Sequence, residues 1–357
     1  MSSRIPVTVI TGFLGAGKTT LLRNLLKNSN QRLAVIVNEF GSVGLDGDLI
    51  RSCGFCPEDD MEGRLVELNN GCLCCTVQDD FLPTMEKLLS RSESLDGIVI
   101  ETSGLALPKP LLQAIEWPQI RSKVFINGVV TLVDSQALSL GSPVGDVKAL
   151  EEQRKLDESI DHITPIKDLF SDQLTCADLV LLSRSDLVDS NVVESIKIDI
   201  SSGLREGTAI LPISYGEINP SLILGLRNDK DSHSSFFSNK ISSKHEHEHE
   251  HEHEHEHLEV ISTSICFEAN ITQSEIKNVL MPLVQNFQIL RLKGRFWLPD
   301  KPLPLQVQMV GPRMSTWFEK APEDVWRPEQ GGLELVALSL KEGLENEIQL
   351  GFNKRFS

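Results

Sequence analysis

The sequence predicts an α/β domain with a doubly wound, mainly parallel sheet, followed by a small α+β domain. Three observations support this fold class. Short apolar runs alternate with helical stretches over residues 1–224. A polar, low-complexity segment over residues 225–257 then interrupts the pattern, which resumes at residue 258. A chain of 357 residues is also long for one hydrophobic core. We therefore expect domains at 1–224 and 258–357, joined by a flexible linker.

The expected strands of the first domain are apolar runs, several of them apolar on both faces, as buried parallel strands are. They cover residues 5–11, 33–38, 97–101, 124–134, 177–183 and 209–214. Helical patterning lies between them at residues 18–28, 108–117 and 191–200. Strands that alternate with helices favour parallel pairing through crossover connections.

The second domain shows a different order of elements. Thr272 and Glu275 have the spacing of a capping box and predict a helix that runs to about residue 285. The expected strands cover residues 258–268, 288–298, 305–310 and 333–340. Strands grouped around one helix indicate a small α+β domain.

The composition restricts the partners. The net charge is 34 minus 51, or −17, which disfavours nucleic acid as a partner because phosphate backbones need basic surfaces. No apolar run approaches the roughly 20 residues that a bilayer crossing needs, and the first residues lack the features of a signal peptide. We therefore expect a cytoplasmic or nuclear protein without a membrane partner; the sequence leaves the oligomeric state open.

A phosphate-binding loop lies between the first strand and the first helix. Residues 12–19 read GFLGAGKT and match G-x-x-x-x-G-K-[ST] in the strand–loop–helix context that this motif requires, which disfavours a chance glycine turn. Lys18 would neutralise the β- and γ-phosphates, and the Thr19 hydroxyl would bind Mg²⁺. The expected phosphate-binding residues are Gly12, Phe13, Leu14, Gly15, Ala16, Gly17, Lys18, Thr19 and Thr20.

Two further strand ends carry candidate nucleotide ligands. Glu101 ends an apolar strand and would hold Mg²⁺ or its water, while Gly104 would offer its N–H to the γ-phosphate. Asp134 is a similar but weaker candidate. Ser183, Arg184, Ser185 and Asp186 stand where N-K-x-D is usual, and Asp186 keeps the carboxylate that accepts from guanine. This favours GTP over ATP.

Three cysteines fall within four residues. Residues 71–75 read GCLCC, and the thiolates of Cys72, Cys74 and Cys75 suit a soft metal such as Zn²⁺ or Cu(I). Three thiolates with an open fourth position are typical of a site that transfers its ion. A buried cysteine-rich turn and a redox pair are the alternatives.

The remaining cysteines and histidines are less informative. Cys53 and Cys56 form a lone C-x-x-C whose role stays open, while Cys176 and Cys266 lie in apolar contexts typical of core residues. Residues 245–257 alternate seven His with six Glu. We interpret this tract as a native segment that gathers divalent ions loosely, since an engineered tag normally lies at a terminus.

Taken together, these motifs resemble the CobW family of metal-chaperone GTPases, and most closely its eukaryotic branch, the zinc-regulated GTPase metalloprotein activators. The resemblance spans nearly the whole chain. It rests on the phosphate loop, a His-rich linker, and the segments NEFG at 38–41, GCLCC at 71–75, ETSG at 101–104 and ILRLKGRFWL at 289–298.

The resemblance implies a zinc chaperone that hydrolyses GTP to GDP and phosphate and transfers Zn²⁺ to a client metalloprotein. Type 1 methionine aminopeptidase is the candidate client. Residues 38–48 would be a switch, with Glu39 a candidate metal ligand and Asp46 a neighbour of Mg²⁺. The catalytic residues would be Lys18, Thr19 and Glu101, the zinc ligands Cys72, Cys74 and Cys75, and Thr76 would approach the nucleotide.

The sequence departs from the family pattern at Ser183, Arg184 and Ser42, where relatives carry Asn, Lys and often Glu. The Cys-Pro client-docking motif of some eukaryotic members is not among residues 1–11. Two alternatives remain: a nickel or cobalt chaperone, and a non-catalytic zinc buffer or sensor with a vestigial nucleotide site.

Overall fold

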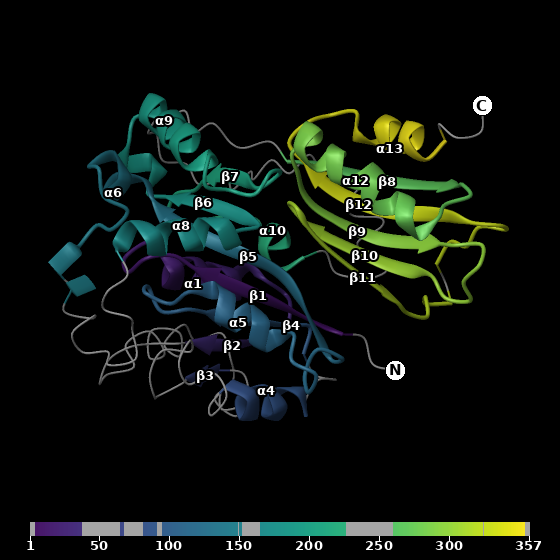
Figure 1. Ribbon diagram of the computed structural model, residues 1–357, viewed down its shortest axis with the longest axis horizontal. Helices are drawn as coiled ribbons and strands as arrows, with labels where there is room; N and C mark the ends of the chain where they lie inside the picture. Colours follow the sequence, from purple (N-terminus) through teal and green to yellow (C-terminus); the bar gives the residue numbers. More distant parts are fainter. Residues whose placement is uncertain are drawn as a thin grey trace, which may run out of the picture. The chain divides into compact units, whose positions relative to one another are not determined.

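The structure is a computed structural model, and it describes residues 4–37, 65–67, 81–90, 95–148, 150–151, 165–225, 260–323 and 325–353. The chain divides into two compact units, Met1–Leu224 and Gly225–Ser357 (Figure 1). Apart from Gly225, the expected linker lies outside the described residues. Within the described part of the chain, no helix is both long and apolar enough to cross a bilayer.

The first unit is built on a seven-stranded sheet of order β3-β2-β4-β1-β5-β6-β7, in which every neighbouring pair is parallel. The predicted doubly wound, parallel fold is therefore confirmed. Strand β1, purple in Figure 1, lies between β4 and β5. The strands are β1 (Ile5–Thr11), β2 (Leu33–Val37), β3 (Leu65–Glu67), β4 (Gly97–Glu101), β5 (Val124–Asp134), β6 (Leu179–Ser183) and β7 (Ala209–Pro212).

Helices pack on this sheet through two apolar clusters. Helices α4 and α5 bury their apolar stripes against β1, β2 and β4, and helices α8 and α9 against β5 and β6. Burial on both faces explains why the strands read as continuous apolar runs. The helices are α1 (Lys18–Asn28), α4 (Leu82–Leu89), α5 (Pro108–Ile115), α6 (Ser135–Ser139), α8 (Ile166–Cys176), η3 (Ser185–Leu187), α9 (Ser190–Ser201) and α10 (Pro220–Leu224).

A bulge in β5 places a side chain that binds the last residues of the first unit. The register of β1 and β5 shifts at Asn127, whose Nδ2 donates to the Thr8 Oγ1 at 2.7 Å. The same amide donates to the carbonyls of Ile223 at 3.2 Å and Leu224 at 3.3 Å, at the end of α10. A buried side chain near the start of β5 therefore holds the point where the chain leaves the sheet.

The second unit is a five-stranded antiparallel sheet of order β11-β10-β9-β12-β8 with an apolar core shared by two helices. This is the predicted α+β domain. Its elements are β8 (Ile261–Glu268), α12 (Gln273–Phe287), β9 (Ile289–Trp297), β10 (Leu305–Val310), β11 (Arg313–Phe318), β12 (Gly332–Ser339) and α13 (Leu344–Asn353). The capping box of Thr272 and Glu275 is present at the start of α12.

Cys266 was expected in the core, and this expectation is wrong. Strand alternation turns Ile265 toward the core of the second unit and leaves Cys266 exposed. Partial burial, and then the nearby Glu334, raise the pKa of the Cys266 thiol. Cys176 is buried in the first unit, as expected.

Candidate nucleotide-binding site

The loop between β1 and α1 takes a conformation that needs its glycines. Gly12, Gly15 and Gly17 have φ values of 135°, 78° and 95°, in the region that side chains disfavour. A Cβ atom at Gly12 would lie 2.4 Å from the carbonyl oxygen of Leu132 on β5. The loop thus lies directly on the neighbouring strand and leads into the amino end of α1, where helix N–H groups favour an anion.

Lys18 folds back over this loop. It is the first residue of α1 and is 7% exposed, and its Nζ donates to the carbonyls of Gly12 at 2.8 Å and Phe13 at 3.1 Å. The ammonium group is therefore already placed inside the curve of the loop. A phosphate bound there would meet a fixed positive charge as well as the backbone N–H groups.

Thr19 and Glu101 lie together at the carboxyl ends of the strands. The Thr19 hydroxyl donates to Oε1 of Glu101 at 3.3 Å, and Glu101 is 4% exposed at the end of β4. A hydroxyl and a carboxylate are hard oxygen donors of the kind that Mg²⁺ prefers. These two predicted ligands fit a magnesium ion beside the phosphate loop.

The chain that follows β4 lies against the tip of the phosphate loop. A Cβ atom at Gly104 would lie 2.5 Å from the backbone nitrogen of Leu14. The Thr102 hydroxyl donates to the Thr11 Oγ1 at 3.0 Å, which joins the ends of β4 and β1. The strand ends thus bring Gly104 to the phosphate loop, where the sequence placed it.

Helix α8 adds two contacts that the sequence did not predict. The Nε2 of Gln173, a buried residue, donates to the carbonyl of Gly104 at 3.3 Å. The rings of Phe170 and Phe13 are 6.1 Å apart. In the sequence, Gln173 is a polar residue on the apolar face of a helix, which is a signal for a buried hydrogen bond. The sequence does not identify the partner, because Gly104 is 69 residues away.

Gly104→Ala is expected to lower nucleotide turnover at least about tenfold, because the methyl group would push the loop after β4 off the phosphate loop. Phosphate release at saturating GTP measures this. Gly97→Ala is the matched control. Gly97 begins β4, the strand that Gly104 follows, and an added Cβ there would lie 3.2 Å from a methyl group of Leu33, which can move. Equal turnover in the two variants would show that the Gly104 contact has no role.

The predicted base-binding residues lie at the end of β6 and directly after it. Ser183 is buried beside the phosphate loop, and its Cβ lies 3.8 Å from where a Cβ of Gly17 would be. Arg184 has a left-handed φ of 53° and forms an ion pair with Asp134 at 2.7 Å. Asp186 lies in η3 and is exposed, so its carboxylate is accessible to a ligand.

The loop of residues 213–216 contacts the base-binding residues, and the sequence analysis did not predict this contact. The hydroxyl of Ser185 donates to the carbonyl of Ile213 at 3.0 Å. Two residues on, the Tyr215 carbonyl accepts from Asn24 of α1 at 2.7 Å, and Tyr215 itself is 75% exposed. Residues 213–216 therefore lie between α1 and the turn that carries Asp186.

The other predicted site residues are not among those that the structure describes. Cys53, Cys56, Cys72, Cys74, Cys75, Thr76, Glu39, Asp46 and the His-Glu tract lie outside the described residues. Among the residues that the structure describes, no group of three or more His, Cys, Asp or Glu side chains forms a metal site. Asp134, the weaker magnesium candidate, uses its two carboxylate oxygens for Arg184 and for the backbone N–H of Ala137.

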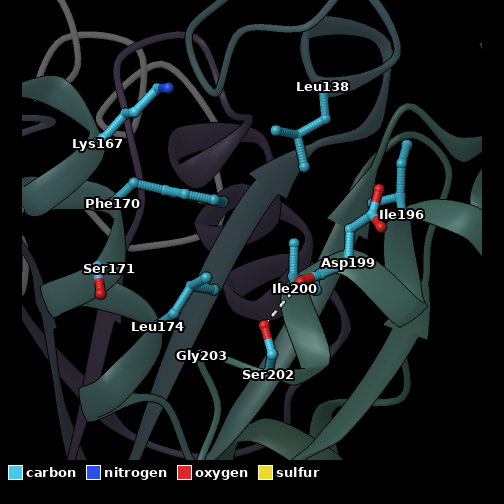
Figure 2. A pocket seen from close by; sticks show the side chains of 10 residues that line it. All are labelled: Leu138, Lys167, Phe170, Ser171, Leu174, Ile196, Asp199, Ile200, Ser202 and Gly203. Atoms are coloured by element: carbon cyan, nitrogen blue, oxygen red, sulfur yellow. Dashed lines mark hydrogen bonds between the residues drawn. The ribbon is translucent and has the colours of Figure 1, made fainter.

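A separate surface cavity of about 300 Å³ lies between α8 and α9. Figure 2 shows Phe170 and Leu174 on one side and Ile196 and Ile200 on the other, with Lys167 at the rim. None of the predicted site residues lines it.

Comparison with known proteins identifies both units. The family model for the CobW/HypB/UreG nucleotide-binding domain matches residues 6–210, and that for the cobalamin synthesis protein cobW C-terminal domain matches residues 260–353. The zinc chaperone CobW of Sinorhizobium sp. is 42% identical over 341 residues, covering 94% of this chain and 93% of the relative. The zinc chaperone CobW of Pseudomonas aeruginosa is 44% identical over 320 residues, covering 89% and 84%. The crystal structure of the Zn(II)-bound YjiA GTPase of Escherichia coli aligns over both full chains with 21% identity and a TM-score of 0.40.

Proposed function

The chain belongs to the CobW/HypB/UreG family of metallochaperone GTPases, and on that premise we propose that it is a zinc chaperone in which GTP binding and hydrolysis control the transfer of Zn²⁺ to a client metalloprotein. The observation that carries the proposal is the arrangement of Lys18, Thr19 and Glu101 around the glycine loop. The names of the two bacterial relatives and the GCLCC segment support zinc as the cargo.

In this proposal the phosphate loop binds the triphosphate and Lys18 stabilises the negative charge that develops as the γ-phosphoryl group leaves. Thr19 and Glu101 would hold Mg²⁺, which neutralises charge on the β- and γ-phosphates when it is bound. The N–H of Gly104 would contact the γ-phosphate. Asp186 would accept from guanine, which favours GTP over ATP.

The metal site would be coupled to the nucleotide through the same edge of the sheet. Strands β2 and β3 are parallel to β1, so the chain leaves both at the edge where the phosphate loop lies. Glu39 follows the end of β2 by two residues, and Cys72 follows the end of β3 by five. Five residues span at most about 17 Å, and this short separation in sequence supports the proposed coupling.

We expect the affinity for Zn²⁺ to differ about 5- to 150-fold between the GTP-bound and GDP-bound protein, because the coupling free energy between two sites is typically 1–3 kcal/mol. Titration with a fluorescent zinc chelator in each nucleotide state measures this difference. The triple substitution Cys72→Ser, Cys74→Ser and Cys75→Ser is expected to abolish the tight site in both states. Equal zinc affinity in the two states would rule out the coupling, since a ligand indifferent to two states shifts neither.

The same titration separates the alternatives. Tighter binding of Ni²⁺ or Co²⁺ than of Zn²⁺ would indicate a nickel or cobalt chaperone, whereas thiolate ligands favour zinc. A zinc buffer would bind the metal without hydrolysing GTP. We propose apo type 1 methionine aminopeptidase as the first client to test for zinc-dependent activation, with the exchange expected in the cytoplasm.

A further inference from the structure

The proposed function gives no role to the ion pair of Arg184 and Asp134. Arg184 follows β6, and its guanidinium group contacts the Oδ2 of Asp134 at 2.7 Å. The backbone of Arg184 is left-handed, with φ of 53°, which costs about 1–2 kcal/mol for a residue with a Cβ. An interaction that fixes the side chain is therefore expected to accompany this conformation.

Asp134 is held more rigidly than its partner. It ends β5 opposite Ser183 of β6, and its side chain is 3% exposed. Its Oδ1 accepts from the backbone N–H of Ala137 at 3.0 Å and thereby caps α6. Helix α6 in turn packs against η3, which contains Asp186. One buried carboxylate thus connects two strand ends, a helix start and the turn that carries the base ligand.

The space around the pair leaves one side of Arg184 accessible. Its side chain is 45% exposed. Gly145 lies close by, because a Cβ atom there would be 3.6 Å from the Oδ2 of Asp134 and 4.0 Å from a terminal nitrogen of Arg184. The backbone therefore approaches the ion pair at Gly145, while nearly half of the Arg184 side chain stays exposed.

We propose that Asp134 is a positioning residue that holds the Arg184 guanidinium group as a flat surface for the base of the bound nucleotide. A guanidinium group can pair with a carboxylate through its edge and still stack on an aromatic ring through its face, which a lysine ammonium group cannot do. The Arg184–Asp134 pair then compensates for the Asn and Lys that this chain lacks. This inference rests on the proposed function, since it assumes that a nucleotide binds here.

Asp134→Asn is the decisive substitution. An asparagine side chain can still cap α6, because Asn and Asp cap helices equally well, but it loses the charge-assisted bond to Arg184. We expect the Kd for GDP, measured by titration with a fluorescent GDP analogue, to rise about tenfold. Arg184→Ala is expected to raise it by a similar factor, and the double variant by no more than the larger single effect.

A second pair of a buried Asp with a partly exposed Arg provides the control. Asp178 precedes β6 at the opposite end of the same strand; it pairs with Arg205 and accepts from the N–H of Val129 at 2.8 Å. Asp178→Asn removes the same kind of pair far from the base and is expected to leave the Kd for GDP within about twofold of the wild-type value.

Three results would overturn the proposal: an unchanged Kd in Asp134→Asn, an equal loss in Asp178→Asn, or losses that add in the double variant. The exposed Arg184 provides a second line of evidence if Asp134→Asn folds poorly. Arg184→Lys should then retain the charge but weaken GDP binding, and wild-type affinity in that variant also contradicts a stacking role. Failure of the wild-type protein to bind GDP at all would instead remove the proposed function itself.

Discussion

Lys18→Ala is expected to lower kcat/KM for GTP hydrolysis about 10²–10³-fold, the effect of removing one preorganised charge that stabilises a transition state. The Nζ of Lys18 is already held inside the loop by the carbonyls of Gly12 and Phe13, so its charge needs no rearrangement before reaction. We expect the loss in turnover to exceed any loss in stability, because the charge that develops in the transition state depends on the ammonium group.

The measurement is phosphate release over a range of GTP concentrations, with circular dichroism to confirm the fold. Lys109→Ala is the matched control, because Lys109 forms an exposed ion pair with Asp172 at 2.6 Å, and such pairs contribute little. Its turnover should stay within about twofold of the wild-type value. Retention of a third or more of the activity in Lys18→Ala would show that the loop does not work as proposed.

Gly12→Ala is expected to destabilise the first unit by about 3 kcal/mol or more. A φ of 135° is almost exclusively a glycine conformation, and the added methyl group would meet the Leu132 carbonyl oxygen at 2.4 Å. Backbone strain and overpacking each cost about 1–3 kcal/mol. The nearest atoms belong to the backbone and Cβ of Leu132, not to the movable end of a side chain. Hydrogen exchange of the β1 and β5 amides in urea reports the stability of this unit specifically.

Gly15→Ala separates the two causes. Gly15 also has a positive φ, 78°, but among the residues that the structure describes, no atom beyond its chain neighbours lies within 4 Å of where its Cβ would be. We expect a loss of only about 1 kcal/mol, the strain alone. Equal losses at the two positions would contradict the close approach of the loop to β5.

The parts of the fold that the sequence predicts well are those whose signal is local. Strands β1, β2, β4, β5 and β6 are buried on both faces, and the phosphate loop is one contiguous motif, so both can be read from neighbouring residues. Strand β11 was missed because its residues are half-buried or exposed at the edge of the sheet, which weakens alternation. Strand β3 has only three residues, too few for any pattern.

The contacts that complete the site depend on distant residues and were not predictable. Asp134 and Arg184 are 50 residues apart, and Gln173 and Gly104 are 69 apart. Each is an ordinary polar residue until the sheet brings the strand ends together. The cysteine cluster, by contrast, is a strong local motif in the sequence. It stays a prediction because it lies outside the described residues.

The Asn127 bulge also fixes the point from which the chain leaves the first unit. Because Asn127 holds the end of α10, the chain starts toward the second unit from a fixed point, seven residues along β5 from Asp134, or about 23 Å. The His-Glu tract begins 21 residues after Leu224, a contour length of at most about 70 Å whatever path the chain takes. If the tract binds ions as the sequence predicts, they would stay within a sphere that includes the nucleotide edge of the sheet. The length of residues 225–244, rather than diffusion from bulk solution, would then set their local concentration there.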